Sequence, residues 1–518
     1  MLHARNLVQG TPYDQTGFIY NPADPWYSPR VYPPGFPLLL APVYAVFGGD
    51  LFALRMVVIA SVVAAVAAFA LLARPILPAP LVLSAAALLG LQPFLVRFKN
   101  LLLPDFTFLV FVLLSLHLVR RLHEKEAGAG TGVALLAGLA LYAALAVRTP
   151  GVALLGAIAL YHLVRWKWPA RPVLICVAVA LTLYGTQFLL MPRGSGYLAQ
   201  FEDIRSVRAP AAHPNVAHAG ATGSRPGDVQ DGAALSGAER TADPEALVPA
   251  PQAPPARSAA RGIPTPAELV RRSRGLYLMT DVLWTSEGDL RAPPLTGLTR
   301  VWVGVLMLLS GLAALVGYAV RLRRPTVLET FVPAYGGILL LWTFPSARYL
   351  IPLLPFLFLY GVLGLTVLAR AGRGGRIVAL AVAALVAVSY AVNLAHATRS
   401  PYDDGVTGAE ATALFEHVGA CVPADARILT FRPRAFALYT GREATSLSLP
   451  ILRDERRLQR VLEDMRVTHV MATRNSQLDS TVAALPGFVR TFGNQRHVLY
   501  ADASAPRLNA RCFAAEPL

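Results

Sequence analysis

The chain has 518 residues, of which 55% are hydrophobic and only 15% are charged, whereas a soluble domain carries about 25% charged residues. Its mean hydropathy is +0.48. One soluble core cannot hide so many apolar side chains, and they are gathered into runs of the length that a bilayer requires, about 20 residues. The composition excludes a soluble globular protein and predicts a polytopic α-helical membrane protein. The net charge of +16 does not indicate nucleic-acid binding, because the Lys and Arg residues stand mostly in short clusters between the apolar runs.

The first 51 residues are mostly polar and lack the apolar core of a signal peptide. Within them, the run from Tyr32 to Pro37 contains three prolines and a glycine. A regular helix is therefore not expected before Leu38, and the run is predicted to be an extended loop held at the membrane surface. The isolated acids Asp14 and Asp24 of this segment are expected to be solvated.

Ten apolar runs are predicted to form transmembrane helices. They occupy residues 52–73, 79–96, 103–119, 133–147, 151–164, 172–191, 300–320, 327–344, 349–369 and 377–396. Alternate connections are rich in cations, namely Arg74; Arg120, Arg121 and Lys125; Arg165, Lys167 and Arg171; Arg321, Arg323 and Arg324; and Arg370, Arg373 and Arg376. By the positive-inside rule these connections face the cytoplasm, and the other connections face outward.

This topology predicts a first outer segment (1–51), transmembrane helices (52–191 and 300–396), an external loop (192–299) and an exported tail (397–518). An outer placement of residues 1–51 requires a preceding helix that crosses outward. We therefore expect the natural reading frame to begin earlier, with one more transmembrane helix in front of Met1.

The external loop and the tail differ in composition. Residues 205–270 are rich in Ala, Pro, Gly and Ser and have almost no aromatic residues, which predicts disorder. The tail alternates helical patterns (413–418, 433–439, 458–465) with strand patterns (427–431, 467–472, 488–492, 497–500), so it is predicted to be a small C-terminal exported α/β domain. Cys421 and Cys512 could pair there after export, whereas Cys176 is expected to be a buried thiol in an apolar run.

Four cations are predicted to lie at the outer ends of transmembrane helices: Arg97, Lys99, Arg148 and Arg348. A lipid phosphate is a natural partner for them, because charge at that depth is costly unless it is neutralised. Snorkelling or an ion pair is the simpler alternative for each. Asp105 heads an apolar helix, where an acid can serve as a cap; we favour a functional role.

The order of these features resembles the GT-C superfamily of integral-membrane glycosyltransferases, in particular the bacterial branch that includes lipid A aminoarabinose transferases and dolichyl-phosphate-mannose-protein mannosyltransferases. The resemblance covers residues 1–400. It rests on Ala4-Arg5-Asn6-Leu7 with Gly10, the run from Tyr32 to Pro42 followed by Phe47-Gly48, Leu103-Pro104-Asp105, Arg148-Thr149-Pro150-Gly151, and Arg348-Tyr349 through Pro355.

The resemblance implies transfer of a sugar from a polyprenyl-phosphate donor to an acceptor on the outer side of the cytoplasmic membrane, with inversion at the anomeric carbon. The sugar stays open, as does the acceptor, which could be a glycan, a lipid such as the lipopolysaccharide core, or a protein. A hydroxyl nucleophile needs proton removal and a departing lipid phosphate needs cations, which agrees with this chemistry.

The resemblance also assigns roles to single residues. Asp105 matches the second family acid, which assists catalysis or holds a divalent metal such as Mg²⁺ or Mn²⁺. The first family acid, the base, would lie upstream of Ala4. Arg5 matches a basic position after that acid, and Arg348 and Tyr349 match the region that meets the donor phosphate. Topology alone adds Arg97, Lys99 and Arg148 as phosphate-binding candidates.

Three alternatives stay open. The chain could be a non-catalytic lipid-phosphate-binding or flippase-like protein, although its Ala/Leu/Val-rich helices carry few polar residues across the membrane. It could be a truncated, inactive member of the family that lacks its base. It could also be a scaffold whose exported tail binds a partner in envelope assembly.

Overall fold

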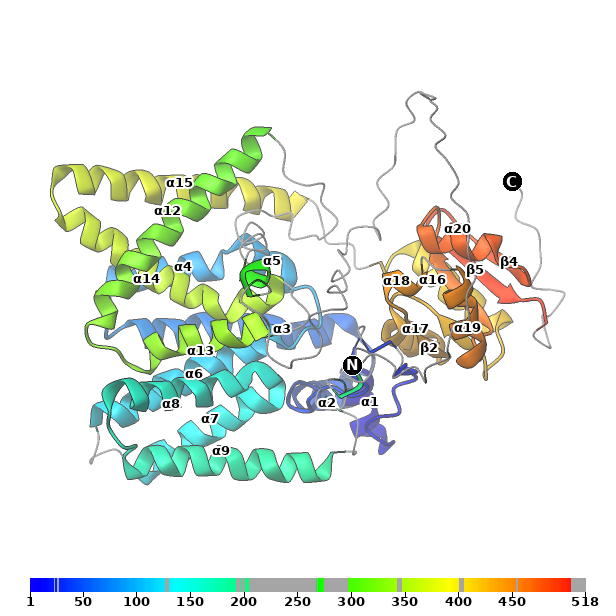
Figure 1. Cartoon of the computed structure of the whole chain (residues 1–518), viewed down its shortest axis with the longest axis horizontal. Coiled ribbons are helices and arrows are strands. Elements are labelled where there is room, and N and C mark those ends of the chain that lie inside the picture. The colour runs from blue at the N-terminus through cyan, green and yellow to red at the C-terminus, as the bar shows by residue number, and fades with distance from the viewer. Residues whose placement is uncertain are drawn as a thin grey trace, which may run out of the picture.

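The structure is a computed structural model with a helical domain and a smaller α/β domain (Figure 1). It describes residues 1–22, 24–25, 28–125, 130–191, 196, 200, 202–204, 267, 269–273, 297–341, 347–399, 405–452 and 455–504. The predicted disorder of residues 205–270 falls almost wholly outside the described residues. The predicted pairing of Cys421 with Cys512 also involves a residue outside them, whereas Cys176 is a buried free thiol, as expected.

The helical domain begins with two short helices in the first segment and continues through all of the apolar runs. Its helices are α1 (Leu2–Gln9), α2 (Gly35–Phe47), α3 (Leu51–Ala73), α4 (Ala79–Gly90), α5 (Pro93–Phe98), α6 (Asp105–Lys125), α7 (Thr131–Val147), η1 (Thr149–Gly151), α8 (Val152–Arg165), α9 (Arg171–Leu190), α12 (Gly297–Leu322), α13 (Val327–Leu341), η3 (Ala347–Leu353), α14 (Leu354–Arg370) and α15 (Arg373–Arg399).

Each of the ten predicted runs is helical, but the number of membrane spans is not confirmed. Among the described residues, six helical segments are long and apolar enough to cross a membrane: 51–73, 105–124, 171–190, 301–322, 347–370 and 373–396. The run at 79–96 is wrong as a single helix, because Pro93 has no N–H to continue α4. The side chain of Gln92 accepts a hydrogen bond from the backbone N–H of Leu95 (2.8 Å) and starts α5 instead.

The prediction that no helix begins before Leu38 is wrong. Helix α2 begins at Gly35, and its first intrahelical bond runs from the N–H of Leu38 to the carbonyl of Pro34 (2.9 Å). Pro37 lies in the first turn, where a backbone N–H has no intrahelical partner, so its missing N–H costs no hydrogen bond. The segment 1–51 thus contains two helices, α1 and α2, and the first loop, which connects them.

The outer surface of the helical domain is apolar, as a lipid-facing surface must be. Large apolar side chains are exposed on α3, α4, α9, α12 and α15, among them Val63, Leu83, Phe188, Leu189, Leu308, Leu315, Ile377 and Leu380. At the end of α8, Trp166 and Trp168 are 88% and 95% exposed, which is typical of aromatic residues at the membrane–water boundary. These features are those of a membrane protein.

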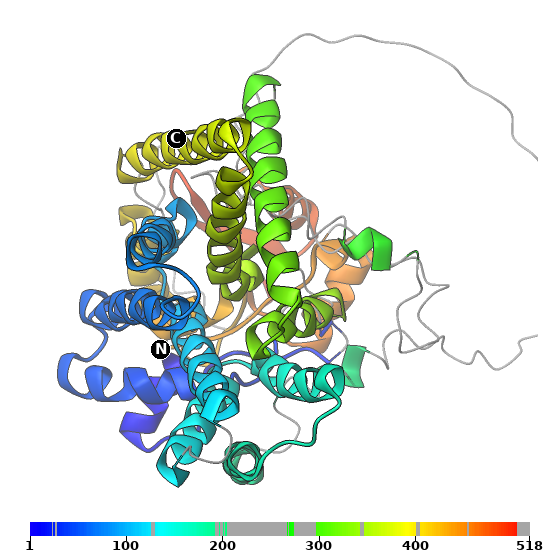
Figure 2. The same ribbon diagram turned by 90° about the vertical axis from the view of Figure 1, so that its left-hand side faces the viewer.

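Helices α12 and α14 cross at close range (Figures 1 and 2). A Cβ atom on Gly317 would lie 2.0 Å from the carbonyl oxygen of Tyr360, and one on Gly364 would lie 1.9 Å from that of Ala313. Small residues at such a crossing let two backbones approach, which is how helices associate in a bilayer that offers no hydrophobic driving force.

The tail is an α/β domain, as predicted. It contains α16 (Ala409–Cys421), β1 (Arg427–Leu429), α17 (Pro433–Thr440), β2 (Glu443–Thr445), α18 (Leu449–Leu452), α19 (Glu455–Asp464), β3 (His469–Thr473), α20 (Gln477–Ala484), β4 (Phe488–Gly493) and β5 (His497–Asp502). The sheet order is β2-β1-β3-β5-β4, with β2, β1 and β3 parallel and β5 antiparallel to both β3 and β4. The sequence patterns missed β2, α18 and α20, which are short.

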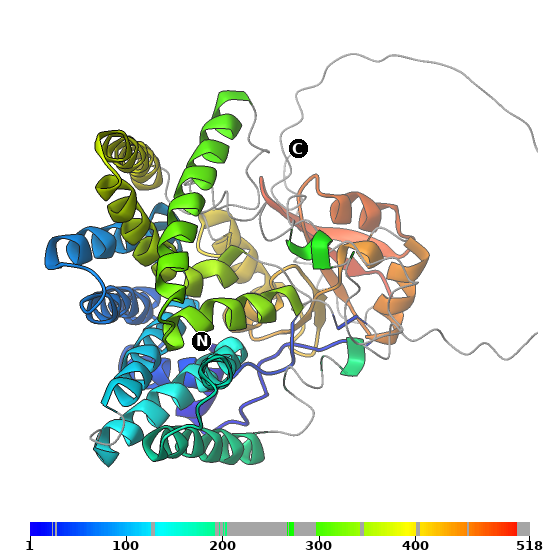
Figure 3. The same cartoon turned by 60° about the vertical axis from the view of Figure 1, so that its left-hand side comes forward.

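The first loop joins the two domains (Figure 3). Phe18 pairs in parallel with Ala444 of β2, and two backbone bonds flank the pair: Ile19 N–H to Ala444 O (2.9 Å) and Ala444 N–H to Gly17 O (2.8 Å). The loop therefore covers the edge of the sheet, which would otherwise present unpaired backbone groups. The expectation that Asp24 is solvated is wrong: it is buried and accepts from the N–H of Ser448 (2.6 Å).

Candidate functional site

The site is built where the first loop, the starts of two helical segments and the end of a third meet. Asp105 lies in the first turn of α6 and is 1% exposed, and Arg148 follows the last residue of α7 and is 8% exposed. An Arg148 N–H donates to Oδ1 of Asp105 in a buried ion pair. The remaining oxygen of Asp105, Oδ2, is buried and has no hydrogen-bond partner among the described residues.

The segment η3 brings a second arginine to this pair. The guanidinium carbon of Arg148 lies 4.7 Å from the ring centroid of Tyr349, and that of Arg348 lies 5.5 Å from the same centroid. Arg348 is also close enough to Asp105 for the two charges to interact. The hydroxyl of Tyr335 donates to the backbone carbonyl of Tyr349 (3.0 Å) and so fixes η3 against α13.

Tyr32 completes the site from the first loop, and sequence reasoning missed it. Its hydroxyl lies 3.1 Å from Oγ of Ser28, and its ring lies 4.5 Å from the guanidinium carbon of Arg434. Burial by itself would raise the pKa of Tyr32, but the charges of Arg434, Arg348 and Arg148, with the hydrogen bond to Ser28, lower it overall. An acidified phenol is a strong hydrogen-bond donor. We call these five residues, Tyr32, Asp105, Arg148, Arg348 and Tyr349, the Asp105 cluster.

The Asp105 cluster has one carboxylate and two guanidinium groups. The pair Asp105–Arg148 is neutral, so Arg348 leaves a surplus positive charge in a largely buried place. Such a charge is costly at membrane depth unless an anion joins it. Arginine forks suit a phosphate, because they donate two parallel hydrogen bonds.

The structure brings together four of the residues that the sequence predicted for the site. Asp105, Arg148, Arg348 and Tyr349 lie in the Asp105 cluster. Lys99 donates instead to the neighbouring Asn100 (3.4 Å), and Arg97 lies in the last turn of α5.

The sequence also indicated Arg5 as a residue that binds the donor phosphate and a divalent metal ion as a possible ligand of Asp105. Arg5 lies on α1, which packs against α2, and its Nε makes no hydrogen bond within the described part of the chain. Nor do any three His, Cys, Asp or Glu side chains in that part gather as a metal site. A Mg²⁺ or Mn²⁺ ion would find only Asp105 as a carboxylate in the Asp105 cluster.

Gly35 explains why the Tyr-Pro-Pro-Gly run lies next to the Asp105 cluster. A Cβ atom on Gly35 would lie 2.7 Å from the carbonyl carbon and oxygen of Ala146, two residues before Arg148. The start of α2 can approach the end of α7 only because this position has no side chain. The run therefore sets the distance between Tyr32 and Arg148.

We expect Gly35→Ala to push α2 away from α7 and to displace Arg148. Overpacking of this kind costs about 1–3 kcal/mol, so the thermal unfolding midpoint of the purified protein should fall. The matched control is Gly49→Ala, where the added methyl meets only the end of Met1 at 3.6 Å and should leave the midpoint unchanged. Equal midpoints for the two variants would contradict the close contact.

The comparisons agree with the expected class of protein. Residues 31–190 match the family model of dolichyl-phosphate-mannose-protein mannosyltransferases. In fold, the chain is similar to two structures of an oligosaccharyltransferase from Archaeoglobus fulgidus. One is tethered to an acceptor peptide (TM-score 0.52, 10% identity, 97% of this chain and 69% of that chain). The other, AglB, is in complex with an inhibitory peptide and a dolichol-phosphate (TM-score 0.51, 12% identity, 97% of this chain and 70% of that chain).

A third structure, ArnT from Cupriavidus metallidurans bound to undecaprenyl phosphate, has a TM-score of 0.49 at 12% identity and covers 97% of this chain and 92% of that chain. No curated protein matches the chain in sequence. The family match over residues 31–190 and the shared fold both agree with the resemblance to membrane glycosyltransferases that the sequence indicated.

Proposed function

We propose that the chain is a glycosyltransferase that moves a sugar from a polyprenyl-phosphate donor to an acceptor on the outer side of the cytoplasmic membrane. The observation that carries the proposal is the buried Asp105–Arg148 pair with Arg348 beside it. It is a largely buried site with surplus positive charge, formed at the ends of apolar helices, in a fold that resembles that of membrane glycosyltransferases.

In this proposal the two arginines hold the donor phosphate. When the bond between the anomeric carbon and the phosphate oxygen breaks, negative charge grows on the departing phosphate, and Arg148 and Arg348 stabilise that charge. Tyr32 donates to a phosphate oxygen. These groups are preorganised, because Tyr349 lies against both guanidinium groups and is itself fixed by Tyr335.

Asp105 has two tasks in this proposal. Oδ1 orients Arg148, and the buried Oδ2 is left to accept a hydrogen bond from a substrate hydroxyl. Attack by the acceptor hydroxyl on the face opposite the phosphate inverts the anomeric carbon and releases the polyprenyl phosphate. The proton of that hydroxyl passes to Oδ2 of Asp105, the one carboxylate of the Asp105 cluster. The placement of the first loop and the α/β domain on the outer side is supported by the cation-rich connections at the other helix ends.

Binding of undecaprenyl phosphate to the purified full chain tests the phosphate site. A hydrogen bond to a charged group contributes about 1.5–3 kcal/mol, so Arg148→Gln and Arg348→Gln should each weaken binding by about tenfold or more in native mass spectrometry. Arg370→Gln, an exposed position at the far end of α14, should bind like the wild type. Lys99→Gln should lose little, because its ammonium group donates to Asn100.

Turnover is tested separately, by the release of polyprenyl phosphate from a polyprenyl-phosphate sugar in the presence of envelope extract. Release that stops in Arg348→Gln supports the enzyme. Tight binding of the lipid with no release of polyprenyl phosphate, whichever acceptor is added, would instead identify a non-catalytic protein that binds lipid phosphates. Unchanged binding in both arginine variants would overturn the proposed site.

A further inference from the structure

Two histidines meet at the ends of helices α6 and α8, far from the Asp105 cluster. His123 lies in the last turn of α6 and His162 in the last turn of α8, and their Nε2 atoms are 3.2 Å apart. At 1.5 Å per residue, His123 lies about 27 Å along α6 from Asp105. The pair is therefore separate from the proposed phosphate site.

The backbone after α8 fixes the tautomer of His162. Nδ1 of His162 lies 3.0 Å from the carbonyl oxygen of Lys167, and a carbonyl only accepts, so Nδ1 carries the proton. This carbonyl meets the ring because Trp166 has a left-handed conformation (φ 50°) and the N–H of Lys167 donates back to the carbonyl of His162 (3.3 Å). In neutral His162 the free lone pair is therefore on Nε2, the atom next to His123. Metal-binding histidines are usually oriented in this way, by a bond from the other ring nitrogen to a carbonyl.

The ring of His123 is held by an aromatic neighbour. Tyr161 stacks on it, with ring centroids 4.2 Å apart and planes 30° from parallel. When a metal ion binds Nε2 of His123, the proton of that ring moves to Nδ1, which is buried and has no hydrogen-bond partner in the described part of the chain. This cost favours the ions that bind imidazole most strongly, which among divalent metals are Cu²⁺, Ni²⁺ and Zn²⁺.

The separation of the two Nε2 atoms matches a shared metal ion. Zn–N bonds of 2.0–2.1 Å at a tetrahedral angle place two nitrogens about 3.3 Å apart, against 3.2 Å here. Helices α6 and α8 both end at the pair, and the negative ends of their dipoles favour a cation. Glu124 pairs with Arg120 (3.2 Å), and no third His, Cys, Asp or Glu gathers with the pair among the described residues. The protein ligands are thus the two imidazoles, and solvent completes the coordination.

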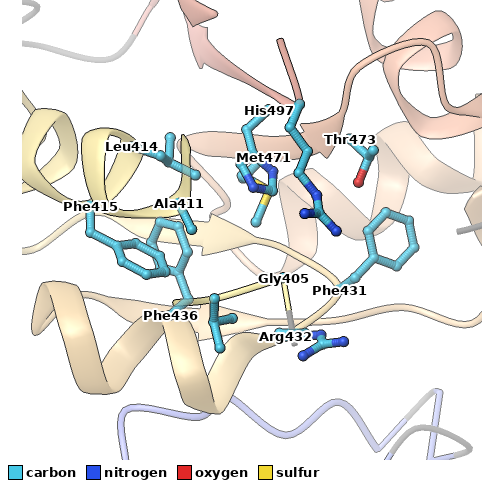
Figure 4. Close-up of a pocket in the computed structure, with 12 residues that line it drawn as sticks. Gly405, Ala411, Leu414, Phe415, Phe431, Arg432, Phe436, Met471, Thr473 and His497 are labelled. Carbon is cyan, nitrogen blue, oxygen red and sulfur yellow. The ribbon is translucent and has the colours of Figure 1, made fainter. Parts of the chain in front are cut away.

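Other histidines have neighbours that do not suit a metal ion. His417 lies against the ring of Phe492, with centroids 4.7 Å apart. His497 lines a pocket of the α/β domain together with Arg432 (Figure 4). An aromatic ring offers no ligand atom, and a guanidinium repels a metal cation. At the ends of α6 and α8, by contrast, two ring nitrogens meet.

We propose that His123 and His162 form a binding site for a divalent transition-metal ion, with Zn²⁺ as the ion that their geometry fits. The two Nε2 atoms bind the ion, which thereby joins α6 to α8. Mg²⁺ and Ca²⁺ are not expected there, because they take oxygen ligands. The site consists of residues outside the Asp105 cluster, so the proposal goes beyond the proposed function and does not depend on it.

Binding of Zn²⁺ to the purified full chain, without a histidine tag and in nanodiscs, tests the proposal by competition with a chromophoric chelator. The chain has 10 histidines, so the variants are compared with the wild type. His123→Gln and His162→Gln should each weaken the tightest Zn²⁺ binding by about tenfold or more, since loss of even an outer partner of a ligand costs 10–100-fold. His396→Gln, at an exposed position on α15, is the matched control and should bind like the wild type.

Thermal unfolding gives a second measurement. Zn²⁺ should raise the unfolding midpoint of the wild type, because it binds the folded chain, and Mg²⁺ at the same concentration should not. The rise should be lost in His162→Gln, which lies at a half-buried position and should fold even if His123→Gln does not. Zn²⁺ affinity that is unchanged in His162→Gln would mean that the two histidines only hydrogen-bond to each other, and would overturn the proposal. An equal loss of affinity in His396→Gln would overturn it as well, because the ion would then bind surface histidines in general.

Discussion

Asp105→Asn should destabilise the protein strongly and weaken its binding of undecaprenyl phosphate, because Oδ1 of Asp105 no longer orients Arg148. The substitution keeps the shape of the side chain but removes the negative charge that Arg148 meets in a buried place. Breaking a buried ion pair by removing one partner costs about 3–5 kcal/mol, because the remaining charge is uncompensated. The thermal unfolding midpoint of the purified chain and the retention of the lipid in native mass spectrometry measure the two effects.

A double variant separates the stability effect from the binding effect. In Asp105→Asn/Arg148→Gln the charge that the single substitution leaves unpaired is also removed, and the surplus charge of Arg348 is the same as in the wild type. The unfolding midpoint should therefore recover toward the wild type, while lipid binding stays weak because Arg148 is gone. Asp50→Asn is the matched control: Asp50 is exposed, its side chain caps α3 by accepting from the N–H of Phe52 (2.9 Å), and asparagine caps equally well. A double variant no more stable than Asp105→Asn would show that the ion pair is not the cause.

The sequence predicted the helical runs well because their signal is local. A run of about 20 apolar residues has few alternatives to a helix in a bilayer, and every predicted run is helical. The errors fell where a single side chain decides a boundary. Gln92 caps α5 and divides the run at 79–96, and Pro37 is compatible with the first turn of α2.

The site was predicted only in part, for a different reason. Asp105, Arg148, Arg348 and Tyr349 could be proposed because each stands at an end of an apolar run that the charge pattern predicts to face outward. The partner of each one depends on tertiary contacts between segments far apart in the chain, which no local pattern specifies. Tyr32 stood in the run that the sequence singled out, but its three arginine neighbours come from η3, α7 and the α/β domain.

The partners of the cations at the other helix ends could not be predicted from the sequence either. Arg321 was predicted from its position as a topological cation, and in the structure it pairs with the buried Glu329 (3.0 Å), which also accepts from Tyr360 (3.1 Å) and Thr326. An arginine in such a network ties α12 to α13 and α14. Position along the chain could not distinguish this role from a topology signal.

Arg434→Ala should loosen the first loop and weaken phosphate binding by the Asp105 cluster, although Arg434 itself belongs to the α/β domain. Arg434 donates to Oγ of Ser28, to the carbonyl of Pro29 (2.6 Å) and to that of Arg30 (3.1 Å). Its guanidinium carbon also lies 4.2 Å from the ring centroid of Phe18. These contacts hold the loop that carries Tyr32. Removal of the guanidinium also removes one of the charges that lower the pKa of Tyr32, so that pKa should rise and the phenol should become a weaker donor.

The expected result is a loss of about tenfold or more in affinity for undecaprenyl phosphate, because charged hydrogen bonds contribute about 1.5–3 kcal/mol and several are lost. Trypsin should cleave the native protein faster after the exposed Arg30, since the loop opens more often. Arg474→Ala is the control, because Arg474 makes the same kind of bond to a carbonyl, that of Asn494 (3.0 Å), within the α/β domain. Faster cleavage with unchanged lipid affinity would mean that Arg434 holds the loop without acting on the phosphate site. Unchanged cleavage would show that the other contacts of the loop, the pairing of Phe18 with Ala444 and the bond from Ser448 to Asp24, hold it without Arg434.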